Sequence, residues 1–284
     1  MGAGSRLLGS VVPMVRASHA APTVAVTSFT TALAAGAGRR SGAVAVAGAV
    51  LAGQLTVGWS NDYLDRHRDG LVGRADKPIV AGEVSASTVG TGALLAAAAC
   101  VPLSLLSGRR AAAWHGVAVA SALSYNLGLK RTAFSVVPYA VAFGALPGFV
   151  SLGGRLGSLP AASTMVAGAL LGAGAHFVNA LPDLADDAVT GVSGLPHRCG
   201  AGRSLIAGAG LLGAATVVVA ARGGRGMGRA AAVLTAASGV SVVGVVAAAL
   251  GDRRRLAWKG SLVSAGLTVA LYLVRDHELT RRPS

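Results

Sequence analysis

Two short stretches hold most of the carboxylates in this sequence of 284 residues, and both follow one pattern. The first reads NDYLDRHRD, residues 61–69, and the second reads NALPDLADD, residues 179–187. Six of the 11 acidic residues and two of the three Asn lie in them, which indicates an internal repeat of a polar motif. In each, an Asn is followed by Asp at steps of four: Asn61, Asp65 and Asp69, and Asn179, Asp183 and Asp187.

A spacing of four keeps successive side chains on one face of a helix, so each motif is expected to present its amide and carboxylates together. Oxygen ligands without His or Cys pairs favour hard ions, and Mg²⁺ commonly binds through carboxylates plus substrate phosphates. The alternative is a pair of solvated helix ends, neutralised by Arg66, Arg68 and Arg74. Repetition favours a site for a Mg²⁺-bound diphosphate, with metal ligands Asp62, Asp65, Asp69, Asp183 and Asp187.

The elements that carry these motifs are apolar. The chain is 53% hydrophobic and 13% charged, with a mean hydropathy of +0.62, whereas a soluble domain has about 25% charged residues. Windows of about 20 apolar residues, enough to cross a bilayer, predict an all-α, polytopic membrane protein with about nine transmembrane helices. They span residues 21–38, 41–60, 84–107, 111–129, 132–154, 156–182, 204–221, 230–251 and 256–274.

We expect a single membrane-embedded domain over residues 1–284, because the loops between the apolar segments leave no room for a soluble domain. Residues 1–20 are a short polar and basic N-terminal segment, and residues 61–83 and 183–203 are the predicted motif-bearing loops. Four crossings separate these loops, so both must face one side of the membrane. With the N-terminus inside, cytoplasmic loops hold 14 of the 25 Lys and Arg, which favours the cytoplasmic side of a cell membrane.

The net charge of +14 is compatible with a nucleic-acid partner, but the Lys and Arg are scattered over the loops and gather on no single face. We therefore expect no nucleic acid, and instead the lipid bilayer and an anionic substrate as partners. Cys100 and Cys199 have no metal-binding or disulfide spacing and are interpreted as structural.

A third stretch, YNLGLKRT at residues 125–132, completes a pattern that resembles the UbiA superfamily of intramembrane prenyltransferases. NDYLDRHRD with the following RADKP is similar to the first Asp-rich motif of that family, and NALPDLADD with TGVSGLPHRCG resembles the second. The resemblance covers nearly the whole chain and implies nine helices around a central cavity, with Mg²⁺ held between the motifs. It also implies a prenyl diphosphate donor and a hydrophobic tunnel for the prenyl tail. The second motif departs from the usual spacing of the family, which leaves Asp186 as an alternative ligand to Asp187.

Ionisation of an allylic diphosphate leaves negative charge, which metal ions and fixed cations stabilise as it develops. We predict catalytic roles for four residues, Asp65, Asp183, Lys130 and Arg131. Residues predicted to bind substrate are Asn61, Arg74, Lys77, Tyr125, Lys130, Arg131, His176 and Asn179. Tyr125, Tyr139 and Phe143 could face the allyl cation or simply pack. His176 could bind the acceptor, accept a proton, or bond to a neighbouring helix.

The sequence therefore predicts a Mg²⁺-dependent prenyltransferase that moves an isoprenyl group to an aromatic or other lipophilic acceptor within the membrane. A UbiA-type membrane terpene cyclase, in which the cation closes on itself, is the alternative that uses the same site. A transporter fits less well, because an ion path needs acids near mid-helix, whereas these lie at predicted helix ends. These residues specify neither the acceptor nor the prenyl chain length.

Overall fold

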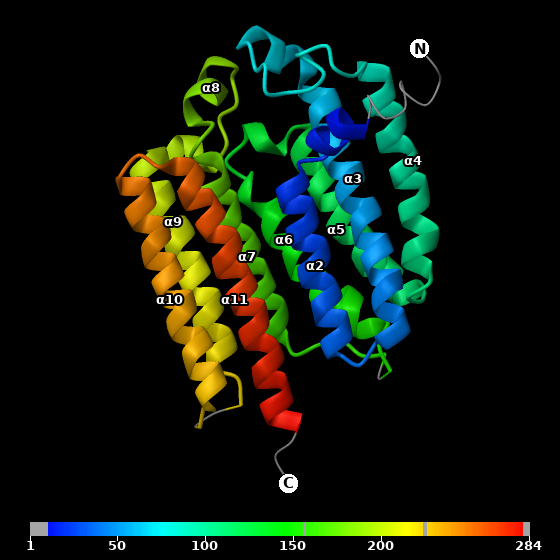
Figure 1. Ribbon diagram of the computed structural model, residues 1–284, viewed down its shortest axis with the longest axis vertical. Helices are drawn as coiled ribbons and strands as arrows, with labels where there is room; N and C mark the ends of the chain where they lie inside the picture. The colour runs from blue at the N-terminus through cyan, green and yellow to red at the C-terminus, as the bar shows by residue number, and fades with distance from the viewer. Residues whose placement is uncertain (1–10, 156, 224–225, 281–284) are drawn as a thin grey trace.

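The computed structural model describes residues 11–155, 157–223 and 226–280 as one bundle of helices that run up and down (Figure 1). These residues contain no strand, so the predicted all-α fold is confirmed. A short helix, α8 (Leu184–Val189), and a 3₁₀ turn, η1 (Leu129–Arg131), lie at one end of the bundle. The long helices are α2 (Ala20–Gly36), α3 (Arg40–Leu71), α4 (Ala86–Leu105), α5 (Arg109–Leu127), α6 (Val136–Leu152), α7 (Ala162–Ala180), α9 (Leu195–Ala220), α10 (Arg229–Leu250) and α11 (Arg254–Thr280).

Five of the described helices, α3, α4, α9, α10 and α11, are long and apolar enough to cross a membrane. Large aliphatic side chains point outward along them, including Leu94 on α4 and Val240 on α10, which are 74% and 72% exposed. Outward aliphatic side chains at this density suit hydrocarbon rather than water. The chain is therefore an integral membrane protein, while crossing by all nine long helices stays a prediction.

Glycine lets the helices approach closely where the bundle is tightest. A Cβ at Gly172 of α7 would collide with the carbonyl oxygen of Tyr139 on α6, and one at Gly168 would lie 2.6 Å from the carbonyl oxygen of Phe143. Helices in lipid associate through such small-residue contacts. The close α6–α7 pair fixes the positions of Tyr139 and His176, which both lie near the candidate site.

Two predicted loop boundaries are wrong. Helix α3 continues through the first motif to Leu71 and ends before Gly73, which has a left-handed φ of 64°, so the predicted loop 61–83 begins as helix. The predicted loop 183–203 contains α8 and the start of α9, which is kinked at Gly200. A hydropathy window stops at the first charges, whereas backbone hydrogen bonding sets a helix end. Residues 1–10 of the predicted N-terminal segment lie outside the described part of the chain.

Candidate active site

The carboxylates of the first motif occupy about the last three turns of α3. Asp62, Asp65 and Asp69 are spaced three and four residues apart, so they share the helix face that points into the bundle. Each residue is at most 4% exposed. Burying three ionised carboxylates is costly unless cations or hydrogen-bond donors compensate them.

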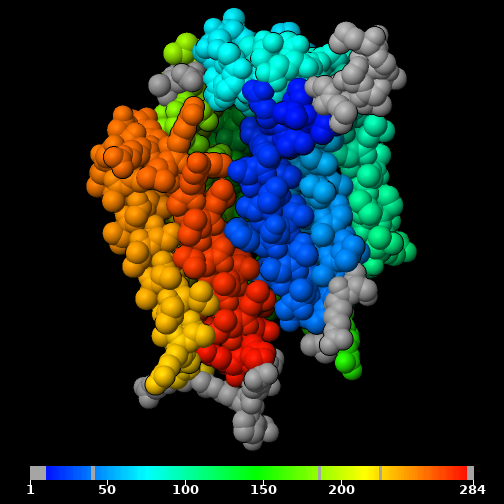
Figure 2. Space-filling model, viewed as in Figure 1, coloured from blue at the N-terminus to red at the C-terminus, as the bar shows by residue number. Residues whose placement is uncertain are grey.

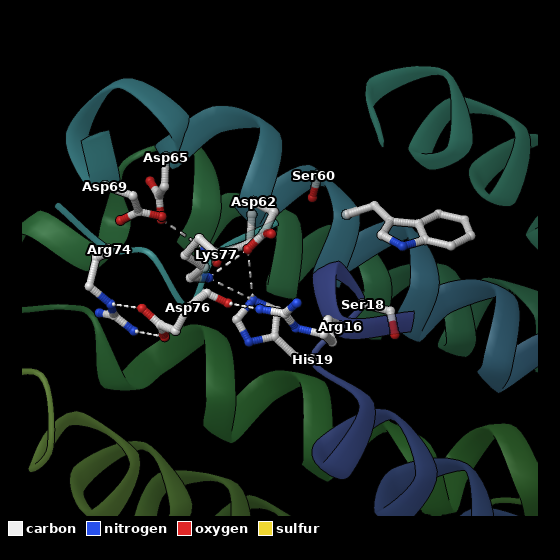
Figure 3. Close-up of polar contacts among 12 residues, drawn as sticks. Arg16, Ser18, His19, Ser60, Asp62, Asp65, Asp69, Arg74, Asp76 and Lys77 are labelled. Carbon is white, nitrogen blue, oxygen red and sulfur yellow. Dashed lines mark hydrogen bonds and ion pairs between the residues drawn. The ribbon is translucent and has the colours of Figure 1, made fainter. Parts of the chain in front are cut away.

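A loop that folds back from the end of α3 compensates Asp62. Lys77 Nζ lies 2.5 Å from Asp62 Oδ1, and His19 Nε2 lies 3.4 Å from the same oxygen (Figure 3). The second oxygen, Asp62 Oδ2, is buried and has no hydrogen-bond partner among the described residues. This orphaned acceptor leaves one strong oxygen ligand available in an otherwise neutralised environment.

Asp65 has the largest set of partners in the first motif. The ammonium of Lys130, from η1, donates to Asp65 Oδ1, and Arg68 Nη2 lies 3.1 Å from Asp65 Oδ2. Arg68 Nη2 also lies 3.4 Å from Asp69 Oδ1. The 3₁₀ turn after α5 thus brings Lys130, which is 4% exposed, against the middle carboxylate of the motif.

The second motif departs from the predicted single helical face. Helix α7 ends at Ala180, Asp183 lies in the following turn, and Asp187 lies in α8. Pro182 accounts for the break, because proline has no N–H to donate and restricts the residue before it. The side chain of Asp183 is 45% exposed and that of Asp187 18% exposed, so this half of the site is more open than the first.

The structure nevertheless brings the two motifs to one end of the bundle. Arg68 Nη1 lies 3.2 Å from Asp187 Oδ1, so a single guanidinium contacts carboxylates of both motifs. Arg74 Nη1 lies 3.2 Å from Asp183 Oδ1 and adds a second cross-link. The side chain of Asp186 lies outside the described part of the structure, and its role as an alternative ligand stays open.

Arg74 is held by a neighbour in its own loop. Its Nε and Nη2 lie 2.8 and 3.0 Å from the two oxygens of Asp76, which makes a two-pronged ion pair (Figure 3). These hydrogen bonds lower the pKa of the Asp76 carboxyl and raise the pKa of the Arg74 guanidinium. Both groups are therefore charged at neutral pH, and Arg74 is oriented toward the second motif.

The two predicted cations of the third stretch lie in different environments. Lys130 is buried on Asp65, whereas Arg131 is exposed and makes no ion pair among the described residues. The carbonyl of Arg131 accepts a hydrogen bond of 3.0 Å from the Ser193 hydroxyl, which ties η1 to the turn before α9. The geometry therefore links Lys130 directly to the carboxylates and Arg131 only to their surroundings.

Asn126 is a site residue that the sequence analysis missed. It is 6% exposed and donates to Val57 O and Ser60 Oγ at 2.9 and 3.0 Å. Its side-chain oxygen accepts from Asn61 Nδ2 at 3.2 Å, and Asn61 also donates to Asp65 Oδ2 at 3.1 Å. The signal was present in the sequence, because Asn126 is the third of only three Asn and lies within the third stretch.

His197 is the second residue that was missed. Its Nε2 lies 3.1 Å from Asp187 Oδ2, on the oxygen that Arg68 does not contact. His197 lies in the first turn of α9, ten residues after Asp187 in sequence. The start of α9 therefore helps to orient the second motif.

Aromatic side chains gather on α5, α6 and α7. The ring of Tyr139 lies 5.2 Å from that of Tyr125 and 4.8 Å from that of His176, while Phe143 lies 6.5 Å from Tyr139. Asn179, which is exposed, donates to the Tyr139 hydroxyl at 3.4 Å. The cluster joins the predicted binding residues Tyr125, His176 and Asn179.

His176 also takes part in a group of contacts that joins α7, the residue before α6 and the start of α9. Its Nε2 lies 3.0 Å from the hydroxyl of Ser135, which precedes α6, and that hydroxyl accepts from the backbone N–H of Leu195 at 2.8 Å. A Cβ at Gly194 would lie 2.6 Å from Lys130 O and 2.8 Å from Ser135 Oγ, so only glycine fits this approach. These contacts hold η1 and the start of α9 together.

The carboxylate oxygens of the two motifs are the type of ligand that a hard divalent ion prefers. The described residues do not include three His, Cys, Asp or Glu side chains already gathered around one point as a metal cluster. Lys77, Lys130 and Arg68 contact the carboxylates instead, as the charge of the buried acids requires. The orphaned oxygen of Asp62 and an all-carboxylate set nevertheless match the ligands that Mg²⁺ prefers.

The structure thus joins two Asp-rich motifs at one end of a helical membrane bundle. Residues 21–278 match the sequence model of the UbiA prenyltransferase family, and the chain belongs to that family. The predicted family is thereby confirmed. No sequence among the curated proteins matches the chain.

Solved structures of low sequence identity share the fold. The apo structure of a UbiA homologue from Aeropyrum pernix K1 has a TM-score of 0.73 and 22% identity, over 87% of this chain and 97% of that one. A structure of digeranylgeranylglyceryl phosphate synthase has a TM-score of 0.66 and 15% identity, over 94% and 99%. A UbiA homologue from Archaeoglobus fulgidus, bound to GPP and Mg²⁺, has a TM-score of 0.63 and 16% identity, over 93% and 99%.

Proposed function

We propose that this protein is a Mg²⁺-dependent prenyltransferase that moves an isoprenyl group from an allylic diphosphate to a lipophilic acceptor within the membrane. The observation that carries the proposal is the guanidinium of Arg68, which contacts Asp65 and Asp69 of the first motif and Asp187 of the second. Two carboxylate sets that already share one cation can share a divalent ion. The Archaeoglobus fulgidus homologue bound to GPP and Mg²⁺ supports the same choice of ion and donor.

Asp62, Asp65, Asp69, Asp183 and Asp187 would hold the ion, with the open half of the site at Asp183 facing the substrate. When bound, Mg²⁺ would neutralise the diphosphate and polarise the oxygen that leaves. The two motifs lie at the end of the bundle that carries α8 (Figure 1), and buried apolar side chains line the interior of the bundle. A prenyl chain whose diphosphate is held there would extend into that interior, away from water.

The cations of the site have a second task in this proposal. Lys77, Lys130 and Arg74 now pair with Asp62, Asp65 and Asp183, and each could turn to phosphate oxygens of the donor. Charge develops on the leaving diphosphate as the C–O bond breaks, so a cation aimed at it lowers the barrier more than it strengthens ground-state binding. Buried Lys130 is the best placed for this role, because its ammonium has little access to water.

The aromatic cluster would face the carbon end of the broken bond. Tyr125 and Tyr139 meet edge to face beside His176, and their π faces can stabilise an allyl cation at short range. His176 is hydrogen-bonded to Ser135 through Nε2, which fixes its ring rather than freeing it. We assign it a positioning role near the acceptor.

A direct test is turnover by the purified protein in nanodiscs. Radiolabelled prenyl diphosphates of graded length are supplied with a panel of aromatic, quinone-precursor and lipid-phosphate acceptors, with Mg²⁺ or with excess chelator. We expect label in an apolar product only when Mg²⁺ and a suitable acceptor are both present. Full turnover in chelator would contradict the metal assignment.

The same assay separates the alternative reaction. Labelled hydrocarbon or terpene alcohol formed from the donor alone would assign the protein as a membrane terpene cyclase with the same diphosphate site. Failure to bind any prenyl diphosphate, measured separately by equilibrium dialysis in Mg²⁺, would reject both.

A further inference from the structure

A basic pocket lies beside the candidate active site, where α10 turns into α11. It has a volume of about 730 Å³ and opens to the surface at the end of the bundle that carries the two Asp-rich motifs. The turn between these helices is the orange segment at the upper left of Figure 2. The pocket, called the α10–α11 pocket below, is lined by Pro182, Asp252, Arg253, Arg254, Arg255, Leu256 and Lys259.

The charges of this pocket are not balanced within the described chain. The guanidinium of Arg254 already has partners within the chain, because its Nε lies 3.1 Å from Asp252 Oδ1 and its Nη1 donates to Leu181 O at 3.3 Å. Arg253, Arg255 and Lys259 are exposed and make no side-chain ion pair or hydrogen bond among the described residues. One carboxylate thus faces four cations.

Helix stability does not explain these cations. Arg254 and Arg255 begin α11, and no acidic residue lies in its first turn. The helix dipole disfavours cations at this end, and neighbouring cations repel one another. The surplus positive charge indicates an anion that comes from outside the chain.

The walls of the pocket also include apolar side chains. Leu256 is 52% exposed and Pro182 contributes a second apolar face. Leu250, at the last turn of α10 just before the pocket, is 75% exposed. An anion with an apolar body attached would satisfy both the cations and these side chains, whereas a free ion would use the cations alone.

We propose that the α10–α11 pocket binds the phosphate of an anionic phospholipid headgroup, held by Arg253, Arg255 and Lys259. The anionic phosphate group is the shared chemistry, and its second source is inorganic phosphate in solution. Clusters of basic residues at a membrane surface attract anionic lipid in this way. Pro182 lies next to Asp183, so a bound headgroup would lie against the turn that carries the second motif.

The test compares three ligands on delipidated protein in neutral detergent: dioctanoyl phosphatidylglycerol, dioctanoyl phosphatidylcholine and inorganic phosphate. Thermal unfolding and native mass spectrometry report binding. We expect phosphatidylglycerol to raise the Tm and to remain bound, with little effect of the other two. The triple variant Arg253→Gln, Arg255→Gln, Lys259→Gln should lose about tenfold or more in affinity for phosphatidylglycerol.

The matched control removes three exposed cations from the opposite end of the bundle, Arg109→Gln, Arg110→Gln and Arg155→Gln, and should bind as the wild type does. An equal Tm shift with inorganic phosphate would assign the pocket to soluble phosphate and overturn the lipid assignment. Equal binding of both lipids, or wild-type affinity in the triple variant, would overturn the proposal altogether. Should the triple variant not fold, the three single variants measured by native mass spectrometry apply the same criterion.

Discussion

Arg68 Nη1 lies 3.2 Å from Asp187 Oδ1, although the two residues are 119 positions apart in the chain. The other amino nitrogen of the same guanidinium contacts Asp65 and Asp69. Arg68 therefore lies between the two acidic motifs and forms ion pairs with carboxylates to which we assign metal binding. The guanidinium and a divalent ion would compete for the same oxygens.

This competition predicts the behaviour of Arg68→Gln. Hydrogen bonds to charged groups contribute roughly 1.5–3 kcal/mol each, so removing the competitor should strengthen metal binding by about tenfold. The same change should lower the Tm of the metal-free protein, because the carboxylates lose a counterion. Calorimetric titration with Mn²⁺ and thermal unfolding in chelator measure the two effects without any substrate.

Arg66→Gln is the matched control for Arg68. Arg66 lies on the same helix end but donates to Tyr63 O and stacks over the Tyr63 ring, 4.3 Å from its centroid. It contacts no carboxylate among the described residues. Metal affinity in Arg68→Gln equal to that in Arg66→Gln would show that Arg68 does not compete for the ligands.

The acids of the two motifs should differ in their effect on stability but not in their effect on activity. Asp65→Asn and Asp183→Asn should each lower kcat/KM by at least about 100-fold, since either loss leaves the diphosphate incompletely neutralised. Only Asp65→Asn should lower the Tm, because it leaves Lys130 buried and without its anion, whereas Asp183 is 45% exposed. Asp276→Asn, at the far end of α11, should leave turnover unchanged, and near-normal turnover by Asp65→Asn would refute the assignment.

Lys130 and Arg131 should not be equivalent. Lys130→Ala should reduce kcat by about 100-fold with metal dependence retained, because it removes a cation aimed at developing charge. Arg131→Ala should reduce kcat by less than about tenfold, since Arg131 is exposed and apart from the carboxylates. Steady-state kinetics with the prenyl donor measure both. Wild-type kcat and KM in the double variant Lys130→Ala, Arg131→Ala would mean that these cations only set topology.

The natural cysteines allow the sidedness of the site to be tested. Cys199 lies half-buried near the start of α9, two residues after His197, which contacts Asp187. Cys100 is buried in α4. A membrane-impermeant maleimide should label Cys199 in inverted vesicles and not in right-side-out vesicles, if the motifs are cytoplasmic. In Cys199→Ser, a new cysteine in Arg109→Cys should show the opposite pattern. Labelling of both positions from one face would contradict the predicted topology.

The fold and the first motif could be predicted because their signals are local. Long uncharged windows predict helices in lipid, and steps of three and four residues place Asp62, Asp65 and Asp69 on one face of α3. The same rule failed for the second motif, because a spacing of four has that meaning only within an unbroken helix. Pro182 lies between Asn179 and Asp183, and α7 ends just before it, at Ala180.

The partners of the carboxylates could not be predicted, since they come from distant parts of the chain. His197 reaches Asp187 only after the turn before α9, and Asn126 reaches Asn61 across the α3–α5 contact. Arg68 was visible only as a local counterion within its own helix. Its contact with Asp187 depends on how α8 packs at the end of the bundle, which no local pattern contains.

The internal pairing of the acids also bears on how this protein is made. Ionised carboxylates that enter a membrane boundary without partners would oppose helix insertion. The counterions of these acids come from the same polypeptide. Lys77 pairs with Asp62, Lys130 with Asp65, and Arg68 with Asp69. Biogenesis of the bundle therefore does not have to wait for magnesium. The counterions of these acids are in place before any divalent ion binds.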